Sequence, residues 1–119
     1  MISIYGLKNC DSCRKAIKWL NSNNIEHKFF NLKDNVLSKS SLSKWINIHS
    51  LEKIINKKST TWRNLDEVSK NQLDTVAVNI IIDFPTLIKR PIWELNTKPH
   101  TELDPGFQDR HQDFIKKLV

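Results

Sequence analysis

The chain has 119 residues, of which 39% are hydrophobic and 27% charged, and its formal net charge is +6. This size and balance predict one soluble globular domain over residues 1–119. No apolar run approaches the ~20 residues of a membrane-spanning helix, and the N-terminus lacks the features of a signal peptide, so we expect a cytoplasmic protein without membrane contact. The charge favours anionic partners, but the lysines are spread along the chain, which argues for a solvated basic surface and against nucleic-acid binding.

The first third of the chain predicts a strand, a helix and a second strand. Residues 2–5 form a short, partly alternating run that predicts a strand ending at Gly6. From Cys10 onward the apolar residues recur at helical spacing. They are Cys13, Ala16, Ile17 and Leu20. Residues 27–32 predict the second strand, and a strand–helix–strand order favours a right-handed crossover between parallel strands.

The middle of the chain is predicted to be helical. Two short helices are expected, one around residues 42–46 and one over residues 51–56. Residues 57–66 are polar and predict a loop. A capping box at residues 69–72 predicts the start of a further helix, which Pro85 ends.

The last part of the chain predicts two strands and a helix. Residues 91–95 predict a strand, and residues 98–103 a short partner strand close enough to form a hairpin. The final helix is expected to begin near Pro105. The whole order predicts an α/β domain with a mixed sheet of about four strands.

Cys10 and Cys13 are the chain's two cysteines, and they lie where the first strand gives way to the helix. The N-terminus of a helix carries unpaired N–H groups and partial positive charge, which stabilise a thiolate. We therefore expect the pKa of Cys10 to fall from ~8.5 toward ~6–7.5. Cys13 lies one turn further on the apolar side, within reach of a mixed disulfide on Cys10. The spacing predicts a nucleophile and a resolving thiol.

Two other interpretations of the cysteine pair remain open. Both residues can be buried core cysteines, since free cysteine often behaves as a small apolar residue. A zinc site needs four ligands, and the four histidines show no characteristic paired spacing, so we expect no metal. We expect His100 and His111 on the surface, and Trp45 and Trp62 as core or cover residues.

A thioredoxin-like unit also needs a cis-proline at the start of its third strand, and Pro91 after Arg90 fits this position. The blocks IYGLKNCDSCRKAIKWL, NKKSTTWRNLD and PTLIKRPI, in this order, resemble the ArsC-related proteins. These comprise glutaredoxin-coupled arsenate reductases, Spx regulators and YffB-type proteins. The segments TTWR and GFQDRHQDF are most similar to the YffB-type branch. The resemblance implies a thioredoxin-like fold with a helical insertion after the second strand.

The resemblance also implies roles for individual residues. Cys10 takes the place of the family's nucleophilic cysteine, and Arg14 matches an arginine at the start of the same helix. Arg90 matches the arginine that contacts the oxyanion or thiol adduct. Lys58 stands where YffB-type proteins have an arginine, and Arg63 is either a second anion contact or a solvated loop charge. A lysine lacks the guanidinium fork, which argues against efficient arsenate reduction.

The resulting functional hypothesis is a thiol-dependent reductase of ArsC/YffB type that uses Cys10 as its nucleophile. The catalytic group is expected to be Cys10, Cys13 and Arg90, and the residues expected to bind the substrate or an anion are Arg14, Lys58, Arg63 and Pro91. No bound cofactor is expected, with glutathione as co-substrate and glutathione, glutaredoxin or thioredoxin as reductant. Cys13 is generally missing from arsenate reductases, whereas Spx proteins carry such a pair as a redox switch. The alternative is therefore an Spx-like regulator that binds RNA polymerase, and a third interpretation is a glutathione-binding member without turnover. We expect a monomer.

Overall fold

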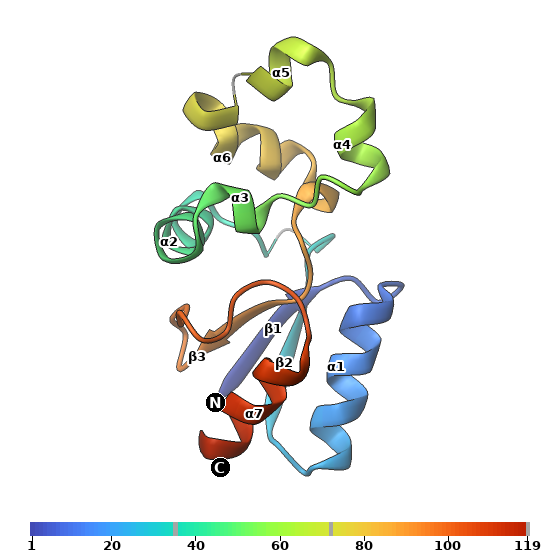
Figure 1. Ribbon diagram of the computed structural model, residues 1–119, viewed down its shortest axis with the longest axis vertical. Coiled ribbons are helices and arrows are strands. Elements are labelled where there is room, and N and C mark those ends of the chain that lie inside the picture. The colour runs from blue at the N-terminus through green and yellow to red at the C-terminus, as the bar shows by residue number, and fades with distance from the viewer. Residues whose placement is uncertain (35, 72, 119) are drawn as a thin grey trace. The chain divides into compact units, whose positions relative to one another are not determined.

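The computed structural model describes residues 1–34, 36–71 and 73–118. The chain forms two compact units. The first consists of Met1–Val36 with Arg90–Val119, and the second is Leu37–Lys89. Figure 1 shows that the first unit holds the sheet and that the second is helical. The second unit therefore has the chain position of the predicted helical insertion after the second strand.

A mixed three-stranded sheet forms the centre of the first unit, within the described residues. Strand β1 (Ile2–Gly6) lies between β2 (His27–Asn31) and β3 (Ile92–Leu95). It pairs in parallel with β2 and antiparallel with β3, so that Ile4 stands opposite both Phe29 and Trp93. The predicted parallel crossover through helix α1 (Asp11–Ser22) is confirmed.

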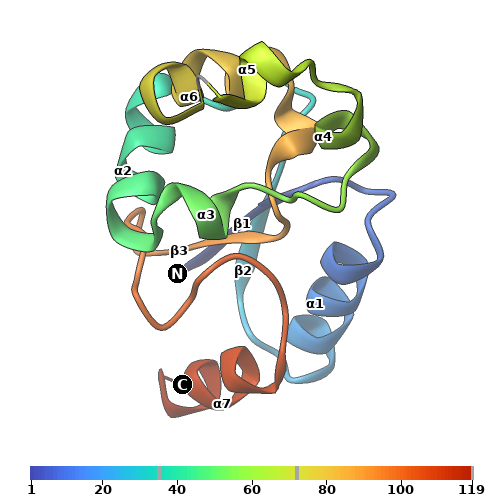
Figure 2. The same cartoon turned by 45° about the horizontal axis from the view of Figure 1, so that its top comes forward.

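The core of the first unit lies on one face of this sheet. Alternate residues of a strand point to opposite faces, and Ile2 and Ile4 of β1 share a face with Trp93 of β3. Apolar residues of helix α1 and of the C-terminal helix α7 (Asp109–Leu118) pack against them. Figure 2 shows the course of these two helices beside the strands. The buried members of the cluster are Ile2, Ile4, Ala16, Leu20, Ile25, Trp93, Leu103 and Ile115. This packing holds the start of α1 beside the end of β1.

The prediction of a fourth strand over residues 98–103 is wrong. Asn96 and Thr97 form a tight turn with positive φ angles of 53° and 67°, and Lys98 then makes a single bridge to Leu95. Beyond it, local hydrogen bonds close another turn. The N–H groups of residues 102 and 103 donate to the Nδ1 and the carbonyl oxygen of His100, at 3.0 and 2.9 Å. These local bonds replace the ladder that a strand would need.

The predicted start of the final helix near Pro105 is also wrong. The chain passes through a buried loop at Pro105 and Gly106, and Gly106 has a φ of 113°. This left-handed conformation suits glycine, since a side chain would clash there. Helix α7 begins only at Asp109.

The second unit opens with the two predicted helices. Helix α2 (Lys39–His49) begins after Ser38, whose hydroxyl accepts the N–H of Ser41 at 3.0 Å. Helix α3 (Leu51–Ile54) follows it. The chain after α3 then pairs with the end of the unit through an antiparallel bridge between Ile55 and Ile88. Trp45 is fully buried in this unit.

The loop predicted over residues 57–66 contains a short helix, α4 (Thr60–Asn64). This helix forms because Ser59 caps its N-terminus: the Ser59 hydroxyl accepts the N–H of Trp62 at 3.1 Å. The capping box predicted at residues 69–72 is not a helix start, since Ser69 lies inside α5 and Gln72 lies outside the described residues. The remaining elements are α5 (Glu67–Asn71), α6 (Leu73–Asp83) and the 3-10 helix η1 (Pro85–Leu87). Across the described part of the chain, every helix is too short or too polar to cross a membrane.

Candidate functional site

The loop between β1 and α1 holds Cys10 at the N-terminus of the helix. The N–H of Cys10 donates to the carbonyl oxygen of Leu7 at 3.2 Å, which closes the loop into a turn. Cys10 is the N-cap residue, with an extended backbone (φ −91°, ψ 124°). Its own carbonyl oxygen accepts the first helical hydrogen bond, from the N–H of Arg14 at 2.9 Å. The predicted placement of Cys10 is therefore confirmed.

The surroundings of the Cys10 sulfur favour its thiolate. Burial raises the pKa of this half-buried thiol, but other contributions outweigh burial. Hydrogen bonds from the backbone N–H and the thiol of Cys13 lower the pKa, as do the hydrogen bond and positive charge of Arg90. The net result is a pKa below the ordinary value for a cysteine. At neutral pH this increases the fraction of the nucleophilic form.

Cys13 has the opposite environment. Its side chain is fully buried, and burial raises its pKa to about 12. A hydrogen bond from the N–H of Leu7 and the charge of Arg90 oppose this rise, whereas hydrogen bonding and charge from Cys10 add to it. The predicted inequality between the two cysteines follows from these contacts. Cys13 is the protonated partner that donates to the Cys10 sulfur.

Gly6 at the end of β1 makes room for Cys13. A Cβ atom at Gly6 would lie 2.4 Å from the Cys13 sulfur and 3.4 Å from its Cβ, and the shorter distance is far inside van der Waals contact. The strand therefore passes directly over the buried sulfur. Sequence analysis treated Gly6 only as the end of a strand and missed this role.

Arg90 and Pro91 enter the site at the start of β3. The Arg90–Pro91 peptide bond is cis, as predicted for this position. Pro91 is buried, and its carbonyl oxygen accepts the N–H of Gly106 at 3.0 Å. The structure thus brings Cys10, Cys13 and Arg90 together, with Pro91 directly after the arginine.

Arg14 lies apart from the interactions that set the Cys10 pKa. It donates from Nη2 to Asp11 Oδ1 at 3.0 Å, and both side chains are exposed. Such a pair contributes little to stability. Anion binding by Arg14 stays a prediction.

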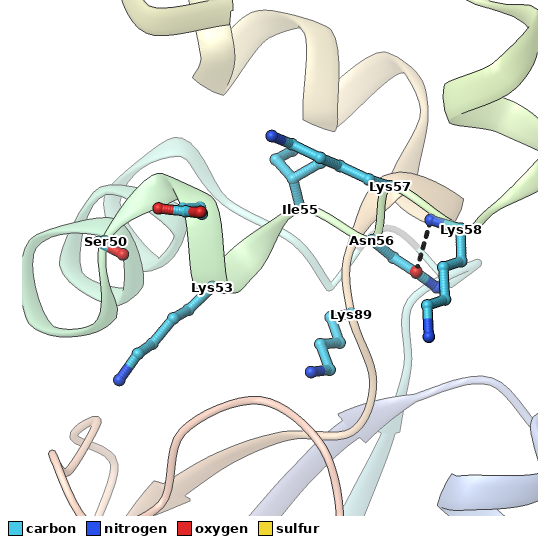
Figure 3. Close-up of a pocket in the computed structure, with 8 residues that line it drawn as sticks. Ser50, Lys53, Ile55, Asn56, Lys57, Lys58 and Lys89 are labelled. Carbon is cyan, nitrogen blue, oxygen red and sulfur yellow. Dashed lines mark hydrogen bonds between the residues drawn. The ribbon is translucent and has the colours of Figure 1, made fainter.

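Lys58 and Arg63 belong to the second unit, where Lys58 borders a hollow of about 550 Å³. In Figure 3, Lys53, Lys58 and Lys89 extend to one side of this hollow, and Lys57 extends the other way. The N–H of Lys58 donates to Asn56 Oδ1 at 3.1 Å, and Arg63 donates to the carbonyl oxygen of Lys58 at 3.3 Å. The two predicted anion contacts are thus neighbours. Their part in anion binding stays a prediction.

The prediction that His111 lies on the surface is wrong. Its side chain is fully buried, and it stacks on Trp93 with ring centroids 6.0 Å apart. His111 precedes Phe114 and Ile115 by three and four residues, a spacing that places it on the apolar face of α7. That spacing could have identified it. Among the described residues, no group of three or more His, Cys, Asp or Glu side chains is placed to hold a metal ion.

The sequence profile of the ArsC family matches residues 5–108, a range that includes Cys10, Cys13 and Arg90. The chain belongs to the ArsC family. An uncharacterised protein of Haemophilus influenzae is 48% identical over 93 residues, covering 77% of this chain and 82% of that protein. The global transcriptional regulator Spx 2 of Bacillus anthracis is 30% identical and covers 100% of this chain and 90% of its own length. The predicted resemblance is thus confirmed, including the similarity to Spx.

Solved structures of ArsC-related proteins have the same fold. A YffB protein superimposes with a TM-score of 0.85 at 28% identity, with 100% of both chains covered. An arsenate reductase from Vibrio cholerae superimposes with a TM-score of 0.73 at 16% identity, covering 99% of this chain and 97% of its own. The thioredoxin-like ArsC fold is therefore confirmed, with three strands in the described sheet where about four were predicted.

Proposed function

We propose that this ArsC-family protein is a thiol-dependent reductase in which Cys10 is the nucleophile and Cys13 the resolving thiol. The observation that carries the proposal is the contrast between the two sulfurs. The Cys10 pKa is lowered by Cys13 and Arg90, while burial raises the Cys13 pKa. A reactive thiolate beside a protonated thiol is the arrangement that two-step thiol–disulfide exchange requires.

In the first step, the Cys10 thiolate attacks one sulfur of a disulfide or glutathione adduct. A Cys10 mixed disulfide forms, and the other half of the substrate leaves as a thiolate that takes a proton from water. Arg90 contacts the Cys10 sulfur before the attack, and its guanidinium can bind negative charge on the substrate. An oxyanion such as arsenate would use the same contact.

In the second step, the Cys13 thiol gives up its proton to the departing thiolate and attacks the Cys10 sulfur. A Cys10–Cys13 disulfide forms, and the bound half of the substrate leaves as a thiol. The negative charge of Cys10 raises the Cys13 pKa, and that contribution disappears once Cys10 is in a mixed disulfide. Cys13 thus becomes easier to ionise when it is needed. Glutathione, glutaredoxin or thioredoxin would then reduce the disulfide, or glutathione would resolve the adduct directly.

The test is glutathione-dependent reduction of a model glutathione mixed disulfide, with arsenate assayed in parallel. Replacement Cys10→Ser should abolish turnover of either substrate, because a hydroxyl at neutral pH carries almost no nucleophilic anion. Cys13→Ser is the matched control, and it should still form one equivalent of the Cys10–glutathione adduct, detected by mass spectrometry. Full activity in a folded Cys10→Ser protein would contradict the proposal.

A second candidate function is an Spx-like redox switch that binds RNA polymerase. The similarity to Spx regulators over the whole chain, together with the adjacent cysteines, favours it. Pull-down with purified RNA polymerase separates the two candidates. Binding that depends on Cys10–Cys13 oxidation, without thiol-exchange turnover, would support the regulator and overturn the reductase.

A further inference from the structure

A buried polar cluster follows β3, and the thiol chemistry does not use it. It consists of two buried residues, His111 (0% exposed) and Asp104 (7% exposed), and of Arg110, whose side chain is exposed. Removing ionisable groups from water is costly, so such groups are retained where they are paired and hydrogen-bonded.

The hydrogen bonds of His111 define its protonation. Its Nδ1 accepts the N–H of Gln108 at 2.9 Å and must therefore carry no proton. Its Nε2 lies 2.7 Å from the carbonyl oxygen and 3.1 Å from the Oδ1 of Asp104, both of which only accept. The geometry therefore requires a neutral ring with its proton on Nε2. Arg110 pairs with the same carboxylate and balances its charge.

These bonds close the loop that holds Pro91. The loop runs from Asp104 to Gln108, and its two ends are joined through the His111 ring. At its centre, Gly106 donates its N–H to the Pro91 carbonyl oxygen at 3.0 Å and accepts Trp93 Nε1–H at 2.7 Å. The His111 ring also stacks on Trp93 at an interplanar angle of 20°. A continuous set of contacts therefore leads from His111 to the carbonyl group of Pro91, the residue that follows Arg90.

We propose that His111 and Asp104 are positioning residues for Arg90, because the loop they close fixes the backbone immediately after it. The proposal rests on the proposed role of Cys10 as nucleophile, which Arg90 supports. Directional hydrogen bonds at both ends of the loop hold Gly106 in place more precisely than apolar packing alone would.

The experiment measures the pKa of Cys10 from thiolate absorbance near 240 nm, in a Cys13→Ser background to isolate one thiol. His111→Phe keeps a ring that can stack on Trp93 but removes both hydrogen bonds. It should raise the Cys10 pKa by roughly half a unit, which lowers the ionisation constant of the thiol about threefold. His111→Gln can still donate a hydrogen bond to Asp104, so it should raise the Cys10 pKa less than His111→Phe does.

Two comparisons separate positioning from a loss of packing. His100→Phe is the matched control, because His100 also accepts a backbone N–H, from Glu102 at 3.0 Å, yet its turn does not bond to Pro91. It should leave the Cys10 pKa unchanged. In an Arg90→Ala background, His111→Phe should add nothing further, since the group that it positions is gone. An equal shift with and without Arg90 would overturn the proposal.

The readout also separates this proposal from the proposed function. If the parent Cys10 pKa is lowered and His111→Phe leaves it unchanged, the positioning role is wrong and the reductase stands. If the shifts appear but the parent protein turns over no substrate, the reductase is wrong and the positioning role stands. If the Cys10 pKa is not lowered in the parent protein, both are wrong. Should the Phe variant fail to fold, Asp104→Asn weakens the same bonds and should raise the Cys10 pKa by a smaller amount.

Discussion

The loop that carries Cys10 and the first turn of α1 that carries Cys13 place the same side chain in two contrasting environments. Cys10 is half-buried, and its sulfur accepts hydrogen bonds from Cys13 and Arg90. Cys13 is fully buried beneath Gly6, and burial dominates its pKa. Burial alone therefore makes a thiol inert, whereas hydrogen-bond donors and a positive charge beside the sulfur make a half-buried thiol reactive.

The largest expected effect comes from filling the space above Cys13. Gly6→Ala places a Cβ 2.4 Å from the Cys13 sulfur, so the strand or the helix must shift. We expect a loss of about 2–3 kcal/mol in the free energy of unfolding, measured by urea denaturation. Adding Cys13→Ala removes the sulfur, leaves a tolerable 3.4 Å contact to its Cβ, and should recover much of the loss. If the losses in the free energy of unfolding of the two single variants simply add in the double variant, the close contact between Gly6 and the Cys13 sulfur is contradicted.

The next largest effect concerns the contribution of Arg90 to the lowered Cys10 pKa. Arg90→Ala removes a hydrogen bond and a positive charge from the Cys10 sulfur, so the Cys10 pKa should rise by about one unit. Thiolate absorbance measures this shift. Arg14→Ala is the matched control, since Arg14 pairs with Asp11 and is exposed, and it should change the Cys10 pKa much less. A larger shift of the Cys10 pKa from Arg14→Ala than from Arg90→Ala would show that Arg14, and not Arg90, stabilises the thiolate.

The smallest effect concerns stability at alkaline pH. The Cys13 pKa rises from 9.0 to about 12 on folding, so above pH 9 the unfolded chain loses this proton while the folded chain keeps it. Stability from this group is therefore complete below pH 9 and is lost as the pH rises toward 12. The loss is at most about 1.4 kcal/mol per pH unit. Urea denaturation from pH 8 to 10 should show a shallower decline in Cys13→Ala than in the parent protein, and parallel declines would refute the prediction.

The periodicity of the sequence was sufficient to predict the βαβ start of the fold and the position of Cys10 at a helix N-terminus. It failed where local hydrogen bonds decide the structure. His100 accepts two backbone N–H groups and turns residues 98–103 away from a strand, and the Ser59 cap turns a polar segment into α4. Alternation and polarity carry no information about these bonds.

The sequence also predicted only part of the candidate site. Spacing and family resemblance identified Cys10, Cys13, Arg90 and Pro91, because these residues share short motifs. Gly6 was missed, since the need for a missing side chain appears only when strand and helix are packed. His111 was misplaced because a polar residue type outweighed its spacing to the apolar residues of α7.

Mapping which cysteine reacts first tests most directly whether Cys10 is the reactive thiol. The reduced protein is treated with a limiting amount of iodoacetamide across a range of pH, and the labelled peptides are quantified by mass spectrometry after digestion. We predict that Cys10 is labelled first at every pH, with a midpoint below the free value of ~8.5, while Cys13 stays protected in the folded protein. Equal labelling of the two cysteines, preferential labelling of Cys13, or a Cys10 midpoint at or above ~8.5 would show that Cys10 is not an activated thiol.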